Sequence, residues 1–206
     1  FTIVKIMRSW HSAGRSPALA PHRMACTFSP PSTQAAISVL QKGGNALDAA
    51  IAASAVQAVV EPQSTSIGGD CFCLYSQAGS DRVIAMNGSG RAPIGLSADW
   101  LLQQGITKIE QQSPHSVTVP TAIDAWVQLN RDYGTTSLGE LLQTAIGYAR
   151  NGFPIGHRVA DDFADCHDLL AGDADIASVY LKNGKDFQYG DLCRNPNLAK
   201  TLDAIA

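Results

Sequence analysis

The stretch that decides the fold reads GGNALDAAIAASAVQAVVEPQSTSIGGD and covers residues 43–70. Asn45 is a favourable helix N-cap, and Asp48 brings a carboxylate into the first turn, where the helix dipole favours negative charge. From 46 to 60 apolar residues, mostly alanine, lie on nearly every face, and such a helix belongs in a protein interior. Glu61-Pro62 ends it, because the residue before a proline is pushed out of the α region. We therefore predict a buried helix at 46–60.

The residues before this helix predict an irregular arm and then one short helix. Prolines at 17, 21, 30 and 31 interrupt regular structure, so residues 1–30 are expected to form an irregular N-terminal arm. Ser32 or Thr33 can cap a helix that runs to Leu40. Gly43-Gly44 supplies the positive φ that ends it.

After the buried helix, two β-rich runs at 71–76 and 82–87 flank a Gly-Ser-Asp turn and predict a hairpin. Small-residue loops precede and follow this hairpin, at 63–70 and 87–93. Both loops allow a close approach of the backbone to another group.

The rest of the chain carries mostly helical signals. We expect helices at 98–104, 121–132 and 138–151, a strand-like run at 116–120, and mainly helices within 155–206. Ser137 and Glu140 have the spacing of a capping box, and Gly152 stands where a glycine ends a helix. The pattern predicts an α/β protein in which residues 31–206 contain no internal domain boundary.

Composition excludes several classes of protein. The chain has 206 residues, 45% of them hydrophobic and 16% charged, with a net charge of −3, which is typical of an ordinary globular protein rather than a disordered chain. No run of Lys or Arg predicts a nucleic-acid partner. No apolar stretch reaches the roughly 18 residues of a membrane span, and no apolar core of a signal peptide is present. The chain begins with Phe, so we expect an upstream piece to be missing. The compartment stays unknown, with the cytoplasm slightly favoured.

The cysteines and histidines predict no metal site. Five cysteines at irregular spacing do not describe a disulfide framework, so we expect packed, reduced thiols. Cys71 and Cys73 lack a second pair of ligands. None of the five histidines lies within four residues of another, and no HExxH pair occurs.

The glycine-rich loops hold the candidate chemistry. Neither matches a phosphate-binding loop, because no Gly-Lys-Ser/Thr follows. Arg91 is the cation of the second loop and could clamp a carboxylate through two parallel hydrogen bonds. The alternative is a surface arginine, or one paired with a nearby aspartate. Ser89 and the other loop serines lack the G-x-S-x-G elbow, and a spatial Ser-His-Asp triad stays open.

Several sequence blocks, in order, resemble the γ-glutamyltranspeptidase family. The match covers roughly residues 17–206. Its blocks are KGGNALDAAIA at 42–52, VEP at 60–62, IGGDCF at 67–72, SVTVP at 116–120, YGT at 133–135, GFP at 152–154 and GDL at 190–192.

This resemblance implies a fold and an activity. The family are N-terminal-nucleophile hydrolases with a four-layer αββα core, of which this chain would be the N-terminal part of the large subunit. A precursor cleaves itself, and the new N-terminal Thr of the small subunit attacks the γ-glutamyl donor, with its own amine as base. No catalytic residue is expected in this chain, which would be inactive alone, and no cofactor is implied. The small subunit and a small γ-glutamyl compound are the implied partners.

Two positions depart from or imitate the family pattern. In the family, the loop after the hairpin usually has the sequence Arg-Glu-x-Ala-Pro, and its Arg binds the α-carboxylate of the substrate. Here Ser89 stands at the family's Arg position, and Arg91 is two residues nearer Pro93, as in a divergent, transpeptidase-like branch. Thr135-Thr136 imitates the cleavage motif but belongs to the large-subunit block, so we do not assign it as nucleophile.

Three functions follow as hypotheses. The first is a γ-glutamyltransferase or glutathione hydrolase. The second is an acylase that cleaves another side-chain amide on the same scaffold, and the third is a non-catalytic binding protein that retains the fold.

Overall fold

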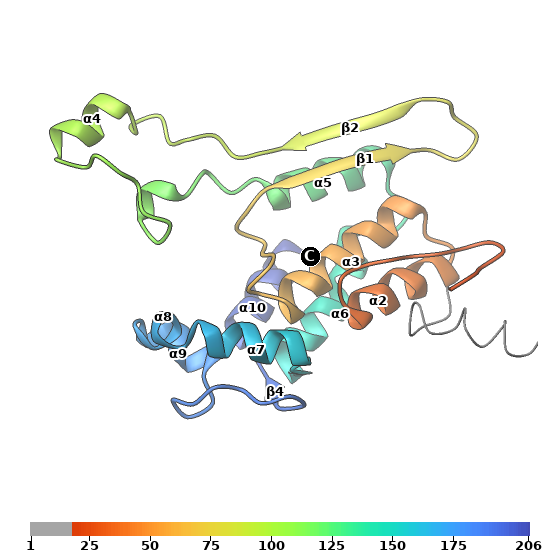
Figure 1. The fold of residues 1–206 in the computed structure, drawn as a ribbon. Helices are drawn as coiled ribbons and strands as arrows, with labels where there is room; N and C mark the ends of the chain where they lie inside the picture. The colour runs from red at the N-terminus through yellow and green to blue at the C-terminus, as the bar shows by residue number, and fades with distance from the viewer. Residues whose placement is uncertain (1–17) are drawn as a thin grey trace, which may run out of the picture.

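Helix α3, Ala46–Val60, lies at the centre of the computed structural model, which describes residues 18–206 (Figure 1). Asn45 caps it with a full capping box: its side chain accepts from the N–H groups of Leu47 and Asp48, and Asp48 accepts from the N–H of Asn45. Val56 and Ala55 are completely buried. The prediction of a buried, alanine-rich helix is confirmed, and so are both of its ends.

Helix α2, Pro30–Gln41, packs against α3 and corrects one prediction. We expected Pro30 and Pro31 to lie outside the helix and Ser32 or Thr33 to cap it. Instead Ser29 is the N-cap, and the prolines fill the first turn. Proline is favoured there because its N–H would have no helical partner and its φ is already helical. Residues 18–29 form neither helix nor strand, and residues 1–17 of the predicted arm lie outside the described part.

Strands β1, Cys71–Ser76, and β2, Val83–Gly88, form the expected antiparallel hairpin. Its inner face lies over α3 and α5, with Tyr75 buried and its ring 5.8 Å from that of Tyr133. Its outer face is apolar and uncovered: Phe72, Leu74 and Val83 are 68%, 79% and 64% exposed.

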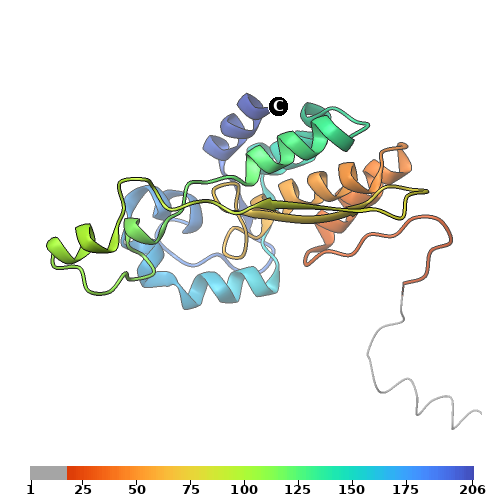
Figure 2. The ribbon, with the colours of Figure 1, turned by 90° about the horizontal axis from the view of Figure 1, so that it is seen from above.

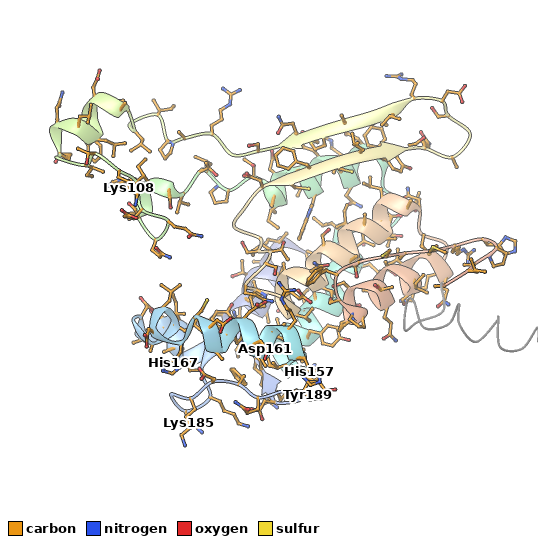
Figure 3. All side chains as sticks on the ribbon, in the orientation of Figure 1. Lys108, His157, Asp161, His167, Lys185 and Tyr189 are labelled. Carbon is orange, nitrogen blue, oxygen red and sulfur yellow. The ribbon has the colours of Figure 1, made fainter. Side chains whose placement is uncertain are left out.

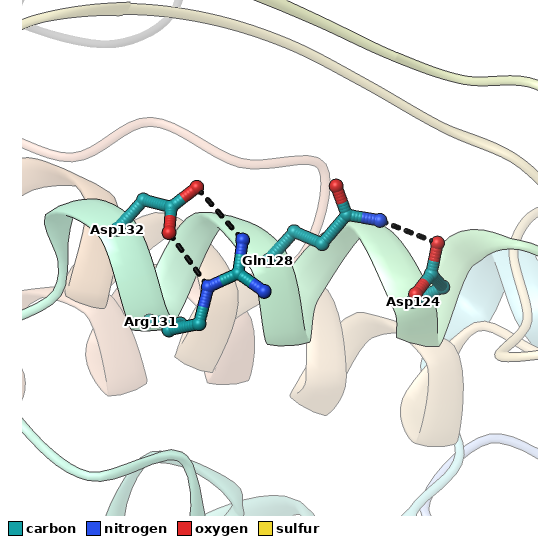
Figure 4. Close-up of polar contacts among 4 residues, drawn as sticks. All are labelled: Asp124, Gln128, Arg131 and Asp132. Carbon is teal, nitrogen blue, oxygen red and sulfur yellow. Dashed lines mark hydrogen bonds and ion pairs between the residues drawn. The ribbon is translucent and has the colours of Figure 1, made fainter.

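Helix α5, Ala122–Tyr133, packs against the hairpin and against α3 (Figure 1). Ala125, Trp126 and Leu129 form its buried face. Its polar face carries local pairs (Figure 4): Gln128 donates to Asp124 at 2.6 Å, and Arg131 donates twice to Asp132. These pairs are exposed, so water and salt screen them. They keep this face in solvent.

Helix α6, Leu138–Asn151, completes the core by packing on α3 and on α10, Pro196–Ile205. Ser137 accepts from the N–H of Glu140, which is one half of the predicted capping box; the Glu140 side chain makes no return bond to the Ser137 N–H. Gly152 ends the helix with φ +101°. Around it lie short elements: β3, Phe153–Pro154; α7, His157–Asp165; α8, His167–Ala171; α9, Ala174–Tyr180; and β4, Leu192–Cys193, which pairs with β3.

Residues 89–121 leave the core as a long excursion that carries α4, Ala98–Gln103, and a 3-10 turn, Pro114–Ser116 (Figures 1 and 2). The prediction of a strand at 116–120 is wrong. Residues 117–120 form no ladder with a strand of the described part; Val119 N–H donates to the Arg91 carbonyl at 2.9 Å, and Val117 N–H donates to the Pro114 carbonyl at 3.4 Å. β-propensity needs a neighbouring strand before it produces a sheet.

Residues 18–206 are therefore a mixed, largely helical structure with two small sheets. No helix in this part of the chain has both the length and the apolar character to cross a membrane.

Candidate functional site

The two glycine-rich loops come together at the N-terminus of α5. The carbonyl of Gly69 accepts the N–H groups of Thr121, at 3.2 Å, and of Ala122, at 2.9 Å. The hydroxyl of Thr121 donates to the carbonyl of Gly88 at 2.6 Å. One residue at the helix start thus fastens the loop before the hairpin to the loop after it.

A second set of hydrogen bonds fixes the backbone around Arg91. Asp70 accepts the N–H of Gly90 at 2.8 Å, and the carbonyl of Arg91 accepts the N–H of Val119 at 2.9 Å. A Cβ at Gly90 would lie 2.1 Å from the carbonyl oxygen of Val119, so no residue with a side chain fits without a shift. This close approach of two backbones is the use expected of a loop glycine.

Arg91 and Ser89, the residues expected to bind substrate, are both exposed on this loop. The N–H of Ser89 donates to the Asn87 side chain at 3.1 Å. Within residues 18–206 the guanidinium of Arg91 makes no ion pair and no hydrogen bond, so no local aspartate neutralises it there. The loop can present one positive charge to a ligand.

A polar hollow of about 370 Å³ lies beside these loops. Its walls come from the loop that follows α3, and Asp70 borders it; the lining residues are Pro62, Gln63, Ser64, Thr65, Ser66, Gly69 and Asp70. An apolar hollow of about 360 Å³ lies instead between residues 22–27 and the first turns of α3, at the other end of that helix.

A buried acid at the base of this loop was not expected from the sequence. Glu61 is 6% exposed, and burial, followed by the charge of Asp162, raises its pKa, while Arg158 opposes the rise. Gln63 donates to Asp162 at 3.1 Å and so connects the loop to α7. The sequence signal of Glu61 was only its position before Pro62, which marked the end of a helix and not a buried carboxyl.

Thr135 has a structural position and not that of a nucleophile. Its hydroxyl donates to the buried Asp48 carboxylate at 2.5 Å, and its N–H donates to the same group at 3.1 Å. The carboxylate thereby joins the cap of α3 to the segment between α5 and α6.

The thiols are reduced, but only some are packed. All five cysteines are free. Burial raises the pKa of Cys71 and Cys73, and raises that of Cys193 to about 11. Cys26 and Cys166 are exposed, which corrects the expectation that all five are packed.

His157 and His167 lie on the α7–α8 side of the structure. Figure 3 shows His157 beside Tyr189, and His167 further along the α7–α8 side. The rings of His157 and Tyr189 stack with centroids 3.7 Å apart, and His167 pairs with Asp186 at 2.6 Å. His11 lies outside the described residues. In residues 18–206 no three His, Cys, Asp or Glu side chains group closely enough to hold a metal ion.

Known proteins share this arrangement over most of the chain. The chain is 35% identical over 189 residues to the glutathione hydrolase-like YwrD proenzyme of Bacillus subtilis, covering 91% of this chain and 34% of that protein. The crystal structure of Helicobacter pylori γ-glutamyltranspeptidase superposes with a TM-score of 0.85 at 28% identity, covering 92% of this chain and 55% of that one. Cephalosporin acylase from Bacillus halodurans superposes with a TM-score of 0.80 at 30% identity, covering 92% of this chain and 38% of that one.

The chain spans about a third of the length of the curated relatives it matches, and it corresponds to their N-terminal part. A family model described as gamma-glutamyltranspeptidase matches residues 32–206, which contain the buried helix, the hairpin and both glycine-rich loops. The fold around the loops and the family match agree, and the chain belongs to the gamma-glutamyltranspeptidase family.

Proposed function

We propose that the full-length protein hydrolyses or transfers γ-glutamyl groups through an acyl-enzyme, and that this chain supplies part of the donor site. The nucleophile would be an N-terminal Thr released by self-cleavage, which lies outside this chain. Its amine would act as the base, and backbone N–H groups would hold the developing oxyanion. No cofactor takes part in this scheme.

The observation that carries the proposal is the position of Arg91. Its backbone is held on both sides, while its exposed guanidinium has no acidic partner in residues 18–206. A guanidinium can grip a carboxylate through two parallel hydrogen bonds, which suits the α-carboxylate of a γ-glutamyl donor. Ser89, on the same loop, would add a hydroxyl contact to the donor.

The uncovered outer face of the hairpin supports the finer architecture. Contiguous exposed apolar surface of this kind usually marks an interaction site. In the four-layer arrangement proposed for the whole protein, a second sheet would cover Phe72, Leu74 and Val83. The small subunit would supply strands of that layer.

A second candidate is an acylase that cleaves another side-chain amide. The two-residue displacement of Arg91 toward Pro93 favours it, and so does the likeness to a cephalosporin acylase. Such a substrate would not need an α-carboxylate, and Arg91 would then be free of a role in binding.

One experiment separates these functions. The full-length protein is first followed on a denaturing gel, where two bands are expected; one persistent uncleaved band would favour a binding protein.

The processed enzyme is then assayed with γ-glutamyl-p-nitroanilide and with an acyl amide that lacks the α-carboxylate. Arg91→Ala should lower kcat/KM for the first donor roughly 10- to 100-fold, because a charged hydrogen-bonded contact is lost. Arg91→Lys, which keeps the charge but not the fork, should recover part of this loss. Preference for the acyl amide, with no effect of Arg91→Ala, would favour the acylase.

A further inference from the structure

Asp70 is an exposed carboxylate that is committed to one backbone group. Its Oδ1 atom accepts the N–H of Gly90 at 2.8 Å, across 20 residues of sequence that include the whole hairpin. A hydrogen bond to an ionised acceptor is roughly twice as strong as one between neutral groups. This bond ties the end of the first loop directly to the residue before Arg91.

The peptide groups on the two sides of Arg91 are therefore both held. Gly90 is held through its N–H by Asp70, and the Arg91 carbonyl is held by the Val119 N–H at 2.9 Å. Together they determine the direction in which the Cα–Cβ bond of Arg91 leaves the loop.

Within residues 18–206 these two hydrogen bonds are the ones that hold the backbone of Gly90 and Arg91. The Arg91 side chain is without a polar partner there, and the preceding Gly88-Ser89-Gly90 run has two residues of high conformational freedom. If the bond to Asp70 were removed, the loop could rotate about Gly90. The guanidinium would then no longer point in one direction before a donor binds.

We infer that Asp70 is a positioning residue for Arg91 and thereby sets the preference of the enzyme for donors that carry an α-carboxylate. The inference rests on the proposed function, since it needs Arg91 to bind that carboxylate. Preorganisation of this kind lowers the free-energy cost of binding without a contact between Asp70 and the donor. The negative charge of Asp70 does not itself favour an anionic donor. Asp70 acts through its carboxylate oxygen, which accepts the Gly90 N–H.

The test compares Asp70→Ala with Asp70→Asn in the full-length processed enzyme. Two donors are used: γ-glutamyl-p-nitroanilide, and 4-aminobutyryl-p-nitroanilide, which lacks only the α-carboxylate. Asp70→Ala should raise KM for the first donor about tenfold with little change in kcat, because ground-state binding is what weakens. Asp70→Asn keeps an oxygen for the Gly90 N–H and should restore KM to within about twofold of the unmodified enzyme. The preference for the first donor over the second should fall in Asp70→Ala alone.

A double-mutant cycle shows whether Asp70 acts through Arg91. Adding Asp70→Ala to Arg91→Ala should cause no further loss, because two residues in one chain of interactions are not additive. Full additivity, or an equal loss for both donors, would overturn the inference and make Asp70 a general structural residue.

The failure of the proposed function gives a different pattern. If Arg91→Ala leaves the preference between the donors unchanged, carboxylate recognition by Arg91 is wrong, and the assigned role of Asp70 in donor preference is overturned with it. If Arg91→Ala abolishes the preference but Asp70→Ala does not, the proposed function stands and only the inference about Asp70 is overturned.

Hydrogen exchange of the backbone amides in residues 87–93 is an independent measurement. Exchange should be faster in Asp70→Ala than in Asp70→Asn. Equal exchange in the two variants would contradict the anchoring of Gly90 by Asp70.

Discussion

At the scale of single residues, Asp48 does the most to organise the polar interior. It is completely buried, and its carboxylate accepts from the N–H of Asn45 and from both the N–H and the hydroxyl of Thr135. A buried carboxylate is tolerated when donors of this kind replace its water. Asp48 therefore holds α3 to the connection between α5 and α6.

Substitution of Asp48 should be costly. Asp48→Ala leaves three donors without their acceptor and should lower the free energy of unfolding by about 3 kcal/mol. Thr135→Val removes one of these donors and should cost about 1 to 2 kcal/mol. Thr135→Ser is the control, because it keeps the hydroxyl.

Urea-induced unfolding of the full-length protein measures the stability of all three variants. Turnover in Thr135→Ser and Thr135→Val should stay close to that of the unmodified protein. Loss of self-cleavage in Thr135→Ala, with normal folding, would contradict the structural role.

His167 makes a pH-dependent contact. Its hydrogen bond to Asp186, then the charges of Asp186 and Asp168, raise its pKa above the ordinary value of 6.5, although burial opposes the rise. Because the pKa is raised in the folded state, the pair contributes stability that is fully present below about pH 6.5 and is lost as pH rises through the raised pKa.

We expect an NMR titration of the His167 ring to give a pKa above the ordinary value, and Asp186→Asn to bring it back. The unmodified protein should be the more stable of the two at about pH 5.5, and the difference should disappear in alkaline solution. An identical ring titration in the two proteins would show that the ion pair does not persist in solution.

At the scale of elements, the ends of helices decide much of the structure. Gly152 ends α6 with φ +101° and ψ 158°, a conformation that is open essentially to glycine alone. A Cβ there would also lie 2.7 Å from the Cγ atom of Leu192 and 2.9 Å from that of Arg194. The turn that ends α6 and the packing of the β3–β4 pair therefore both require a glycine at position 152.

Two glycines of α6 should respond in opposite directions. Gly152→Ala should destabilise the protein by about 2 to 3 kcal/mol, because it adds backbone strain and steric conflict. Gly147→Ala is the matched control: no neighbouring atom lies within 4 Å of its Cβ, and it sits inside the helix. It should stabilise the protein by about 0.5 to 1 kcal/mol. The midpoint of urea unfolding checks both signs, and two changes of the same sign would contradict the assigned end of α6.

At the scale of the whole molecule, the hairpin exposes an apolar outer face to water. Phe72 and Leu74 alternate with the inward-facing residues of β1, so their exposure follows directly from strand geometry. A sheet with apolar residues on both faces is typical of one that is covered on both sides. The rest of the full-length protein is the proposed cover.

Charged residues on this face should therefore damage the full-length protein. Leu74→Asp should lower its stability by roughly 2 to 3 kcal/mol or more, the scale of burying one large apolar side chain. Ser76→Asp, at the end of the same face, is the control and should change stability by less than about 0.5 kcal/mol. Thermal unfolding of the processed protein gives the comparison. A neutral Leu74→Asp would show that the outer face of the hairpin stays in water.

Local sequence determined most of the elements. The ends of α3 follow from Asn45, Asp48 and Pro62, the hairpin from its two β-rich runs and the turn between them, and the end of α6 from Gly152. Each of these signals acts within a few residues, because helix caps, turns and strand propensity are local. Proline has opposite effects at different positions: it interrupts the interior of a helix, but Pro30 and Pro31 occupy the first turn of α2.

Tertiary structure alone decided how these elements make a site. Asp48 meets Thr135 across 87 residues, Asp70 meets Gly90 across 20, and Thr121 meets Gly88 across 33. No periodicity in the sequence encodes such partners, since each depends on how helices and loops pack. For the same reason residues 117–120 have strand-like composition and form no strand in the described part, and Glu61 is buried although no local signal predicts it. The sequence by itself determined the helices, the hairpin and the glycine loops, and packing determined which backbone groups those loops hold.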